Sequence, residues 1–265
     1  MQRPLLEVKD LAVDFIVSGQ KIEAVKKISF SVFAQETVVI AGESGSGKTV
    51  SCLALTKLLP ANAHIRCGEV LFRGRNLVSF SEQALQAIRG SKIAYCFQEP
   101  TSYLNPVYTI EEQIKEVLWF CQHIKGKQAR NYAIHLLEQV KIKEPLRVLT
   151  SYPHQLSGGM NQRVFLAMGL AGRPELFIAD EPTTALDVTI EQEILKLLMD
   201  LKKEYNFALL FITHNLAIAR KIAQRVYIMH QGLIVEEKKT EELFSNPEHQ
   251  HAKELIAAYE KIGKI

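Results

Sequence analysis

No stretch of the sequence stays apolar over the roughly 20 residues that a membrane-spanning helix requires. The amino terminus, MQRPLLEVKD, is rich in charged side chains, and no signal-peptide core follows it. We therefore expect a soluble or peripheral protein, for which any role at a membrane requires a partner.

Cysteine and excess charge are also scarce. The four cysteines lie far apart and form no CxxC pair, so we expect free thiols that serve as packing residues in a reducing compartment. The net charge is only +3, and the 32 basic residues are scattered without a run of five or six. A nucleic-acid partner is therefore not expected.

The composition is otherwise that of an ordinary globular protein, with 265 residues of which 47% are hydrophobic and 23% charged. Apolar and polar residues alternate over residues 5–33, which predicts an antiparallel β layer with a turn near Ser18-Gly19-Gln20. Short apolar runs predict the buried strands of a parallel sheet at 37–41, 175–180, 207–213 and 225–230.

Helical spacing of apolar residues predicts helices at 50–59, 110–124, 128–140 and 190–201, the first ended by Pro60. The helix-rich middle interrupts the alternation of strands and helices. The sequence therefore predicts one domain over 1–265, with an inserted helical lobe at about 88–165. A short helical tail is predicted at about 240–265, broken at Asn246-Pro247.

One segment carries a specific chemical signal. Residues 42–49 meet the pattern GxxxxGK[ST] between a strand-type run and a helix-type run. Glycines let consecutive backbone N–H groups turn inward toward phosphate, the lysine can reach the β- and γ-phosphates, and the threonine hydroxyl can hold Mg²⁺. The alternative is a surface turn that fits the pattern by chance. The residues are Gly42, Glu43, Ser44, Gly45, Ser46, Gly47, Lys48 and Thr49.

Two carboxylates follow the apolar run 176–179. Asp180 and Glu181 are predicted at the carboxyl end of a buried strand, where ligands bind in open α/β sheets. Asp180 suits Mg²⁺, and Glu181 suits a base that orients and deprotonates an attacking water. The alternative is a pair of acids at an exposed strand end, which is less favoured because the same sheet is predicted to carry a phosphate loop.

Residues 156–160, Leu-Ser-Gly-Gly-Met, form a second segment suited to phosphate. Ser157 is suited to cap a helix, and the glycines leave backbone N–H groups open. With this segment in place, the chain resembles the ATP-binding cassette (ABC) family over nearly its whole length. The motifs follow the family's order: the phosphate loop, Gln98 in CFQEP, LSGGM, Asp180-Glu181, Thr184-Ala185-Leu186-Asp187 and Thr213-His214.

The resemblance implies the fold class and the cofactors. The fold would be a P-loop NTPase of the ABC-cassette type, with a RecA-like parallel core, an antiparallel β layer and an inserted helical lobe. ATP and Mg²⁺ would be the cofactors, with Thr49, Gln98 and Asp180 near the metal. Phe15 resembles the aromatic residue that stacks on adenine, although a strand phenylalanine is equally expected to belong to the core.

The resemblance also implies catalytic roles and a dimer. Gln98 would contact the attacking water, and His214 would contact the γ-phosphate and hold that water with Glu181. The remaining residues would serve a second cassette, identical or paralogous, arranged head to tail. Of these, Ser157, Gly158 and Gly159 would bind its γ-phosphate, and Asp187 would cross the interface. The alternatives are that Gln98 is an ordinary loop glutamine and that His214 is an ordinary histidine at the end of a strand, each without a catalytic role.

Three segments resemble the oligopeptide, dipeptide and nickel importer branch of the family: SYLNPV at 102–107, YPHQ at 152–155 and IADEPTTALDVT at 178–189. In that branch Asn161 stands where arginine is frequent, and Asn215 where aspartate usually follows the histidine. Asn105 and Pro106 would help to form a groove for a membrane subunit. His249 and His251 are expected to be surface residues rather than metal ligands.

The resemblance therefore implies an ATPase that powers an importer of the peptide or nickel class, in which ATP closes the head-to-tail dimer and hydrolysis reopens it. The ATPase would be peripheral at the cytoplasmic face of the inner membrane, with two transmembrane permease subunits and, indirectly, a solute-binding protein as partners. The alternative is a soluble ABC ATPase of the DNA-repair or translation type. The short interval from Lys48 to Ser157 disfavours the first of these, and a single cassette disfavours the second. A P-loop kinase or GTPase would not explain LSGGM, and an exporter would not explain 98–107.

Overall fold

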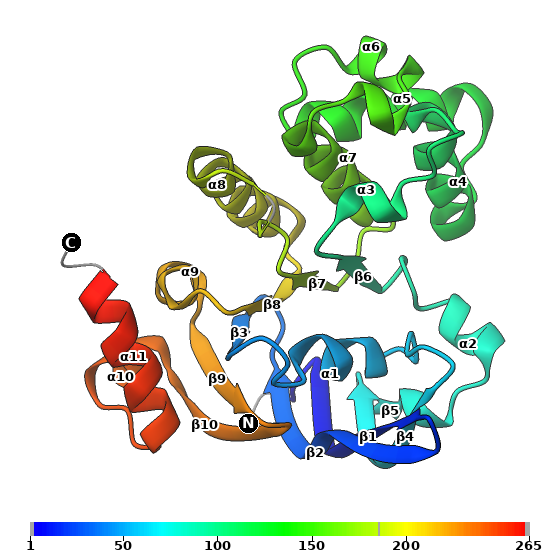
Figure 1. Ribbon diagram of the computed structural model, residues 1–265. Coiled ribbons are helices and arrows are strands. Elements are labelled where there is room, and N and C mark those ends of the chain that lie inside the picture. Colours follow the sequence, from blue (N-terminus) through cyan, green and yellow to red (C-terminus); the bar gives the residue numbers. More distant parts are fainter. Residues whose placement is uncertain (1–2, 185, 263–265) are drawn as a thin grey trace. The chain divides into compact units, whose positions relative to one another are not determined.

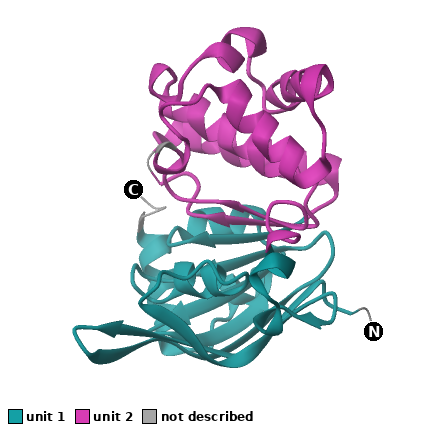
Figure 2. Ribbon diagram, turned by 90° about the vertical axis from the view of Figure 1, so that its right-hand side faces the viewer, with its two compact units in different colours: residues 1–85, 208–265 teal, residues 86–207 magenta. Residues whose placement is uncertain are grey.

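The computed structural model describes residues 3–184 and 186–262. The chain forms two compact units (Figure 2). Unit 1 comprises residues 1–85 and 208–265, and unit 2 comprises residues 86–207. Together they confirm the predicted α/β class, and no helix within the described ranges is long and apolar enough to cross a lipid bilayer.

Unit 1 begins with an antiparallel sheet, as the alternation over 5–33 predicts. Its strands occur in the order β2-β1-β4-β5 (Figure 1). The turn between the first two strands uses Ser18 and Gly19, both with positive φ. The bounds are β1 Leu6–Val17, β2 Gln20–Val32, β4 Ala63–Phe72 and β5 Arg75–Asn76.

A second group of strands in unit 1 is mostly parallel. Strand β3 (Thr37–Ala41), buried at every residue, lies between β8 (Ala208–Thr213) and β9 (Arg225–His230). Strand β10 (Leu233–Lys239) is antiparallel to β9. Because Ala41 pairs with both Thr213 and Ile228, the carboxyl ends of three strands meet at one edge. The phosphate loop and His214 both start from this edge.

The helices of unit 1 are short except the last. One prediction was wrong in its extent: the helix expected at 50–59 ends at Ala54. Lys57 takes a positive φ of 54°, and the Leu58 amide turns back to the Leu53 carbonyl, so the chain leaves the helix before Pro60. The bounds are α1 Lys48–Ala54, η1 Leu77–Ser79, α2 Glu82–Gln86, α9 Leu216–Ile222, α10 Thr240–Ser245 and α11 Gln250–Ile262. The break at Asn246-Pro247 separates the last two, as predicted.

Unit 2 holds two parallel strands and most of the helices. Helix α4 starts with a capping box, in which the Thr109 hydroxyl accepts from the Glu112 amide and the Glu112 carboxylate accepts from the Thr109 amide. Leu136, Leu137 and Leu166 are fully buried where helices pack. The bounds are β6 Ile93–Cys96, α3 Pro100–Tyr103, α4 Ile110–Gln122, α5 Gly126–Gln139, α6 Pro145–Thr150, η2 Pro153–Gln155, α7 Gly158–Leu170, β7 Leu176–Asp180 and α8 Val188–Tyr205. The lobe predicted at 88–165 falls within this unit and remains a prediction as a subdomain.

Candidate functional site

The phosphate loop of unit 1 curls tightly between β3 and α1. A Cβ added at Gly42 would lie 2.1 Å from the Met229 carbonyl oxygen, so there is no space for a side chain at this position. Gly47 has a φ of 104°, and a Cβ there would lie 2.7 Å from the Ala24 carbonyl oxygen. The Gly232 amide also donates to the Ser46 carbonyl at 2.9 Å. The motif glycines are therefore required because neighbouring strands press against the loop.

The loop holds a positive charge within its own curve. The Lys48 side chain is 5% exposed, and its ammonium donates to the carbonyl oxygens of Gly42 at 2.9 Å and Glu43 at 2.8 Å. Thr49, at the next position, is exposed, as are Ser44 and Gly45. The buried ammonium and the glycine-lined backbone form a cradle of the kind that receives phosphate.

His214 follows β8 at the strand edge from which the phosphate loop also starts, and its side chain is exposed. The next residue, Asn215, caps α9: its side-chain oxygen accepts from the Ala217 amide at 2.9 Å. This is the role that an aspartate would have at the position, so the departure from the branch pattern keeps the cap. A cavity of about 660 Å³ lies beside His214, lined also by Leu216, Leu255 and Tyr259.

Phe15 lies on β1, opposite Ile22 of β2 and Ala63 of β4. It is half-buried and does not belong to the fully buried core. Its neighbour Ile16 is 45% exposed and Ile22 is 51% exposed, so this end of the hairpin presents apolar surface. The contact of Phe15 with adenine stays a prediction.

In unit 2, the carboxylate pair follows β7 as predicted. Asp180 is the last, buried residue of the strand. Glu181 takes a left-handed backbone with a φ of 44°, a conformation that costs a non-glycine residue on the order of 1 kcal/mol. Its carboxylate accepts from the Thr184 hydroxyl at 3.0 Å. Backbone strain of this kind clusters at functional positions. The positive φ of Glu181 turns the chain sharply just after β7 ends.

Gln98 lies just beyond β6 and is exposed. The strand ends in Cys96, which pairs with Ala179 next to Asp180. Burial is the main cause that raises the pKa of Cys96 to about 12, and the Asp180 charge adds to it. The Gln162 amide, which donates to the Cys96 sulfur at 3.1 Å, acts in the opposite direction. Cys96 is thus a neutral packing thiol, as expected, whereas Cys67 is exposed and the packing expectation was wrong for it.

The Ser157 and Asp187 segments of unit 2 come together, which sequence reasoning had not predicted. The Ser157 hydroxyl caps α7 by accepting from the Met160 amide at 3.3 Å. The Asp187 carboxylate caps α8 by accepting from the Ile190 amide at 3.0 Å. A Cβ on Gly159 would lie 3.1 Å from the Ile190 side chain, so the two helix starts abut. Ala185, in the predicted loop before Asp187, lies outside the described residues.

The exposed side chains at these helix starts include Ser157 and Asp187, and Gly158 is exposed with them. Asn161, one turn into α7, is 2% exposed, and its amide nitrogen donates to the Pro153 carbonyl at 3.0 Å. Asn161, which stands where arginine is frequent in the branch, therefore links η2 to α7 through a buried hydrogen bond. Because it is buried, Asn161 is not part of the exposed surface that Ser157 and Asp187 form.

One residue was misjudged from the sequence. His251 was expected at the surface, but it is 8% exposed, and its ring centroid lies 3.7 Å from that of His230. Burial, followed by the neighbouring His230, lowers the pKa of His251. The helical spacing carried little signal, because His251 lies one and five positions from the buried Ala252 and Ile256, and not the three or four that place residues on one face of a helix. His249 is exposed, as expected.

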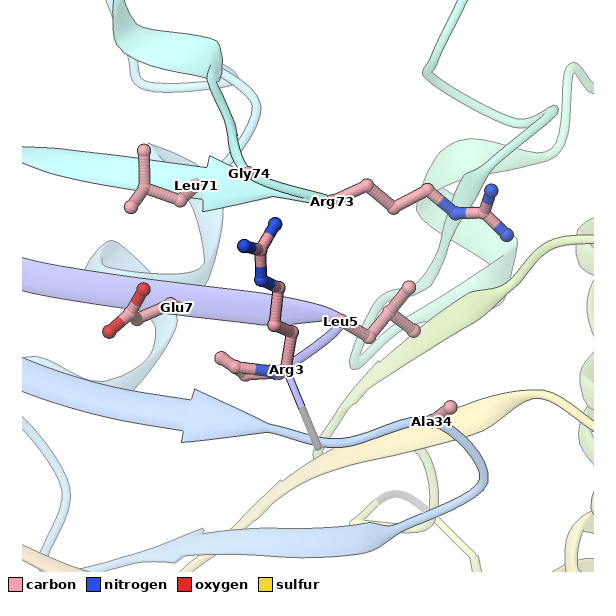
Figure 3. A pocket seen from close by; sticks show the side chains of 8 residues that line it. Arg3, Leu5, Glu7, Ala34, Leu71, Arg73 and Gly74 are labelled. Atoms are coloured by element: carbon pink, nitrogen blue, oxygen red, sulfur yellow. The ribbon is translucent and has the colours of Figure 1, made fainter. Parts of the chain in front are cut away.

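A further cavity of unit 1, of about 550 Å³, lies at the start of β1 and the end of β4. Figure 3 shows the Arg3 side chain reaching toward Gly74, while Arg73 extends away. None of the residues that line it is a predicted nucleotide-binding residue. This cavity is therefore separate from the candidate site.

Comparisons with known proteins place these features in context. A sequence model of the ABC transporter family matches residues 25–184. The peptidoglycan transport ATP-binding protein YejF of Agrobacterium fabrum is 49% identical over 260 residues, which cover 98% of this chain and 48% of YejF. The oligopeptide transport ATP-binding protein OppD of Bacillus subtilis is 44% identical over 255 residues, 96% of this chain and 71% of OppD.

Solved structures agree with the sequence matches. A dimeric, post-hydrolysis structure of the ATP-binding cassette MJ0796 bound to ADP and Pi is 29% identical, with a TM-score of 0.79. That match covers 89% of this chain and 98% of the MJ0796 chain. The likeness shows the cassette fold that the sequence predicts. The present chain spans about half the length of YejF. We therefore give the activity and the partners of the whole protein only as a proposal.

Proposed function

Because the chain belongs to the ABC transporter family, we propose that it is the ATP-hydrolysing subunit of a membrane importer of the peptide class. The observation that carries this proposal is the phosphate loop of unit 1, with its sterically required glycines and its internal Lys48 ammonium. The names of the relatives refer to transport, which favours a transporter over a DNA-repair or translation ATPase.

The residues fit the binding of Mg-ATP. Lys48 would exchange its contacts with the loop carbonyls for the β- and γ-phosphates, and the loop amides would receive the remaining phosphate oxygens. In this proposal the Thr49 hydroxyl, the Gln98 amide oxygen and the Asp180 carboxylate would hold Mg²⁺, because oxygen atoms are the ligands that it prefers. The bound ion would supply positive charge to offset the charge that develops on the phosphates. Phe15, which is half-buried on β1, would stack on adenine.

Hydrolysis in this proposal depends on two side chains that position the water. The Glu181 carboxylate, oriented by the Thr184 hydroxyl, accepts the proton of the attacking water. His214 donates to the γ-phosphate and holds the same water. The strained backbone of Glu181 supports this role, since such conformations are kept where they orient a functional group.

A second cassette, identical or paralogous, completes the proposal. Ser157, Gly158 and Gly159 would bind the γ-phosphate held by that partner, and Asp187 would contact the partner across the interface. The exposure of these helix starts and their mutual contact support this arrangement. Val188, 70% exposed beside Asp187, gives the same surface an apolar residue for the partner to cover.

The loop 103–108 of unit 2 is the proposed contact with the membrane subunits. The buried Gln113 side chain holds this loop by accepting from the Asn105 amide and donating to the carbonyls of Asn105 and Tyr108. Tyr103 is 55% and Val107 73% exposed. A rigid loop with apolar residues in solvent suits a helix of a permease subunit. In this proposal the chain is peripheral at the cytoplasmic face of the inner membrane, with a solute-binding protein acting indirectly.

The transported solute is proposed from the relatives alone. The name of OppD refers to oligopeptide transport and that of YejF to peptidoglycan transport, which favours a solute that contains a peptide over nickel or a metal chelate.

The proposal is tested with Glu181→Gln in the full chain. We expect ATP turnover to fall by roughly 10²–10⁴-fold, the range for loss of a general base, while ATP binding persists. A dimer should then accumulate with ATP and Mg²⁺ in size-exclusion chromatography. The matched control is Glu138→Gln, an exposed carboxylate of α5 in the same unit, which should leave turnover unchanged. A strictly monomeric Glu181→Gln variant with full ATPase activity would refute both roles.

A further inference from the structure

Three potential metal ligands converge in unit 1 from segments far apart in the sequence. Glu43 belongs to the phosphate loop, His230 ends β9, and His251 lies in the first turn of α11. One ligand atom from each residue lies within 4.8 Å of the other two. The two imidazole rings are 3.7 Å apart between centroids and tilted by 33°. Tertiary packing alone creates this cluster, because 187 residues separate Glu43 from His230.

His251 supplies an independent sign that the cluster takes a ligand. Its side chain is 92% buried, and its Nε2 atom has no hydrogen-bond partner among the described residues. Buried polar atoms in folded proteins nearly always have a partner, so an orphaned ring nitrogen calls for an explanation. The backbone beside it is fixed, since the His251 amide donates to the His249 ring nitrogen at 3.2 Å. The orphaned nitrogen is shielded from solvent, and the ring that carries it is a member of the cluster.

We propose that Glu43, His230 and His251 form a binding site for a divalent transition metal of the zinc class. Two imidazole nitrogens and one carboxylate oxygen are a ligand set that Zn²⁺ accepts, with a water or a fourth group completing the shell. Because two of its three donors are nitrogen atoms, the site does not suit Mg²⁺, which selects oxygen ligands. Ligand atoms on a tetrahedral Zn²⁺ with bonds of about 2.0–2.1 Å lie closer together than 4.8 Å, so a donor at that limit would move inward to bind. Glu43 is exposed, which leaves it able to make that movement.

The position of the site gives it a structural consequence. A metal held by these three residues joins the phosphate loop to β9 and to the carboxy-terminal helix α11. The metal would bind the Glu43 carboxylate, and the backbone carbonyl oxygen of the same residue accepts a hydrogen bond from the Lys48 ammonium. The site would therefore tie the carboxy-terminal helix to the nucleotide loop through a metal. The proposal does not rest on the proposed transport function, because no step of hydrolysis enters it.

The test titrates the full chain, free of nucleotide and Mg²⁺, with Co²⁺ and with Zn²⁺. We expect one equivalent of Co²⁺ to produce the visible absorption of a low-coordinate ion, and Zn²⁺ to displace it. His230→Gln and His251→Gln should each weaken Zn²⁺ binding by at least about 100-fold. Glu43→Gln should weaken it by at least about 10-fold, because glutamine keeps a weaker oxygen donor. Zn²⁺ should also raise the unfolding temperature of the unaltered chain.

The matched control is His64→Gln, which removes an exposed histidine of β4 in the same unit and should leave Zn²⁺ affinity within about two-fold. Circular dichroism and metal-free unfolding temperature establish that each variant is folded. If a histidine variant fails to fold, Glu43→Gln and the His64→Gln control still decide the question, since both positions are exposed. Unchanged affinity in Glu43→Gln, or loss of binding in His64→Gln alone, would overturn the proposal.

Discussion

Substitution of Gly42 by alanine tests whether the phosphate loop depends on its contact with β9. A Cβ at residue 42 would lie 2.1 Å from the Met229 carbonyl oxygen and 3.1 Å from the Met229 carbonyl carbon. Contacts of Cβ atoms under 3.0 Å are essentially never seen, so one of the two segments must move by roughly 1 Å. Met229 is held in β9 between β3 and β10, and the more mobile partner is therefore the loop.

The expected cost follows from that displacement. A misplacement of about 1 Å in a catalytic site reduces the rate by about 10²-fold, so kcat/KM for ATP should fall by about two orders of magnitude. Overpacking a tight interior contact should also lower the free energy of unfolding by about 1–3 kcal/mol. The loss should be mainly in ATP affinity, because the displaced backbone is the part that receives phosphate.

The assay combines steady-state phosphate release, equilibrium binding of a fluorescent ATP analogue, and urea unfolding. The control is Gly74→Ala, which adds the same methyl group at a site with nothing within 4 Å. Its φ of 75° predicts a loss of about 1 kcal/mol in unfolding free energy with ATPase activity unchanged. If Gly42→Ala binds ATP as well as the unaltered chain, the steric argument for the loop is wrong.

Two further predictions concern stability. Asn215→Ala should lower the free energy of unfolding by about 1 kcal/mol because α9 loses its cap, while Asn215→Asp should retain it; urea unfolding measures both. Cys96 ionises near its ordinary pKa of 9.0 in the unfolded chain but at about 12 when folded. Above pH 9 the unfolded chain binds fewer protons, so stability falls as pH rises, by up to about 1.4 kcal/mol per pH unit from this group. Urea unfolding from neutral pH to about pH 11 should show a shallower decline in Cys96→Ala; an identical decline would contradict the assignment.

Much of the fold was predictable because its signals are local. Alternation over 5–33 produced the antiparallel hairpin, and the continuous apolar runs became β3, β7, β8 and β9 almost to the residue. Local periodicity reports which face a segment must bury, and burial decides the element. Strand β10 escaped notice because its sequence, LIVEEKK, has no clean alternation; its position is decided by pairing with β9. The early end of α1 also depended on backbone turns that the apolar pattern does not encode.

The candidate site, like the fold, has some features that local sequence patterns predict and others that they do not. The residue types of the site and their order could be read directly from the sequence: the GxxxxGKT loop, the carboxylate pair, Ser157 before two glycines, and the histidine after β8. These are covalent neighbours, so their spacing is visible in one dimension. The family is also evident from the sequence, since the motifs occur together.

Contacts between groups that are distant in the sequence became visible only once the elements were packed together. The tertiary structure placed the Met229 carbonyl against Gly42, the Ile190 side chain against Gly159, and His251 against His230. It also placed Glu181 in a left-handed turn that its residue type disfavours. Contacts of this kind arise from the packing of whole elements, whose relative positions depend on all the side chains between them. For that reason the phosphate loop was predictable as a motif, while its dependence on β9 and its nearness to a histidine pair were not.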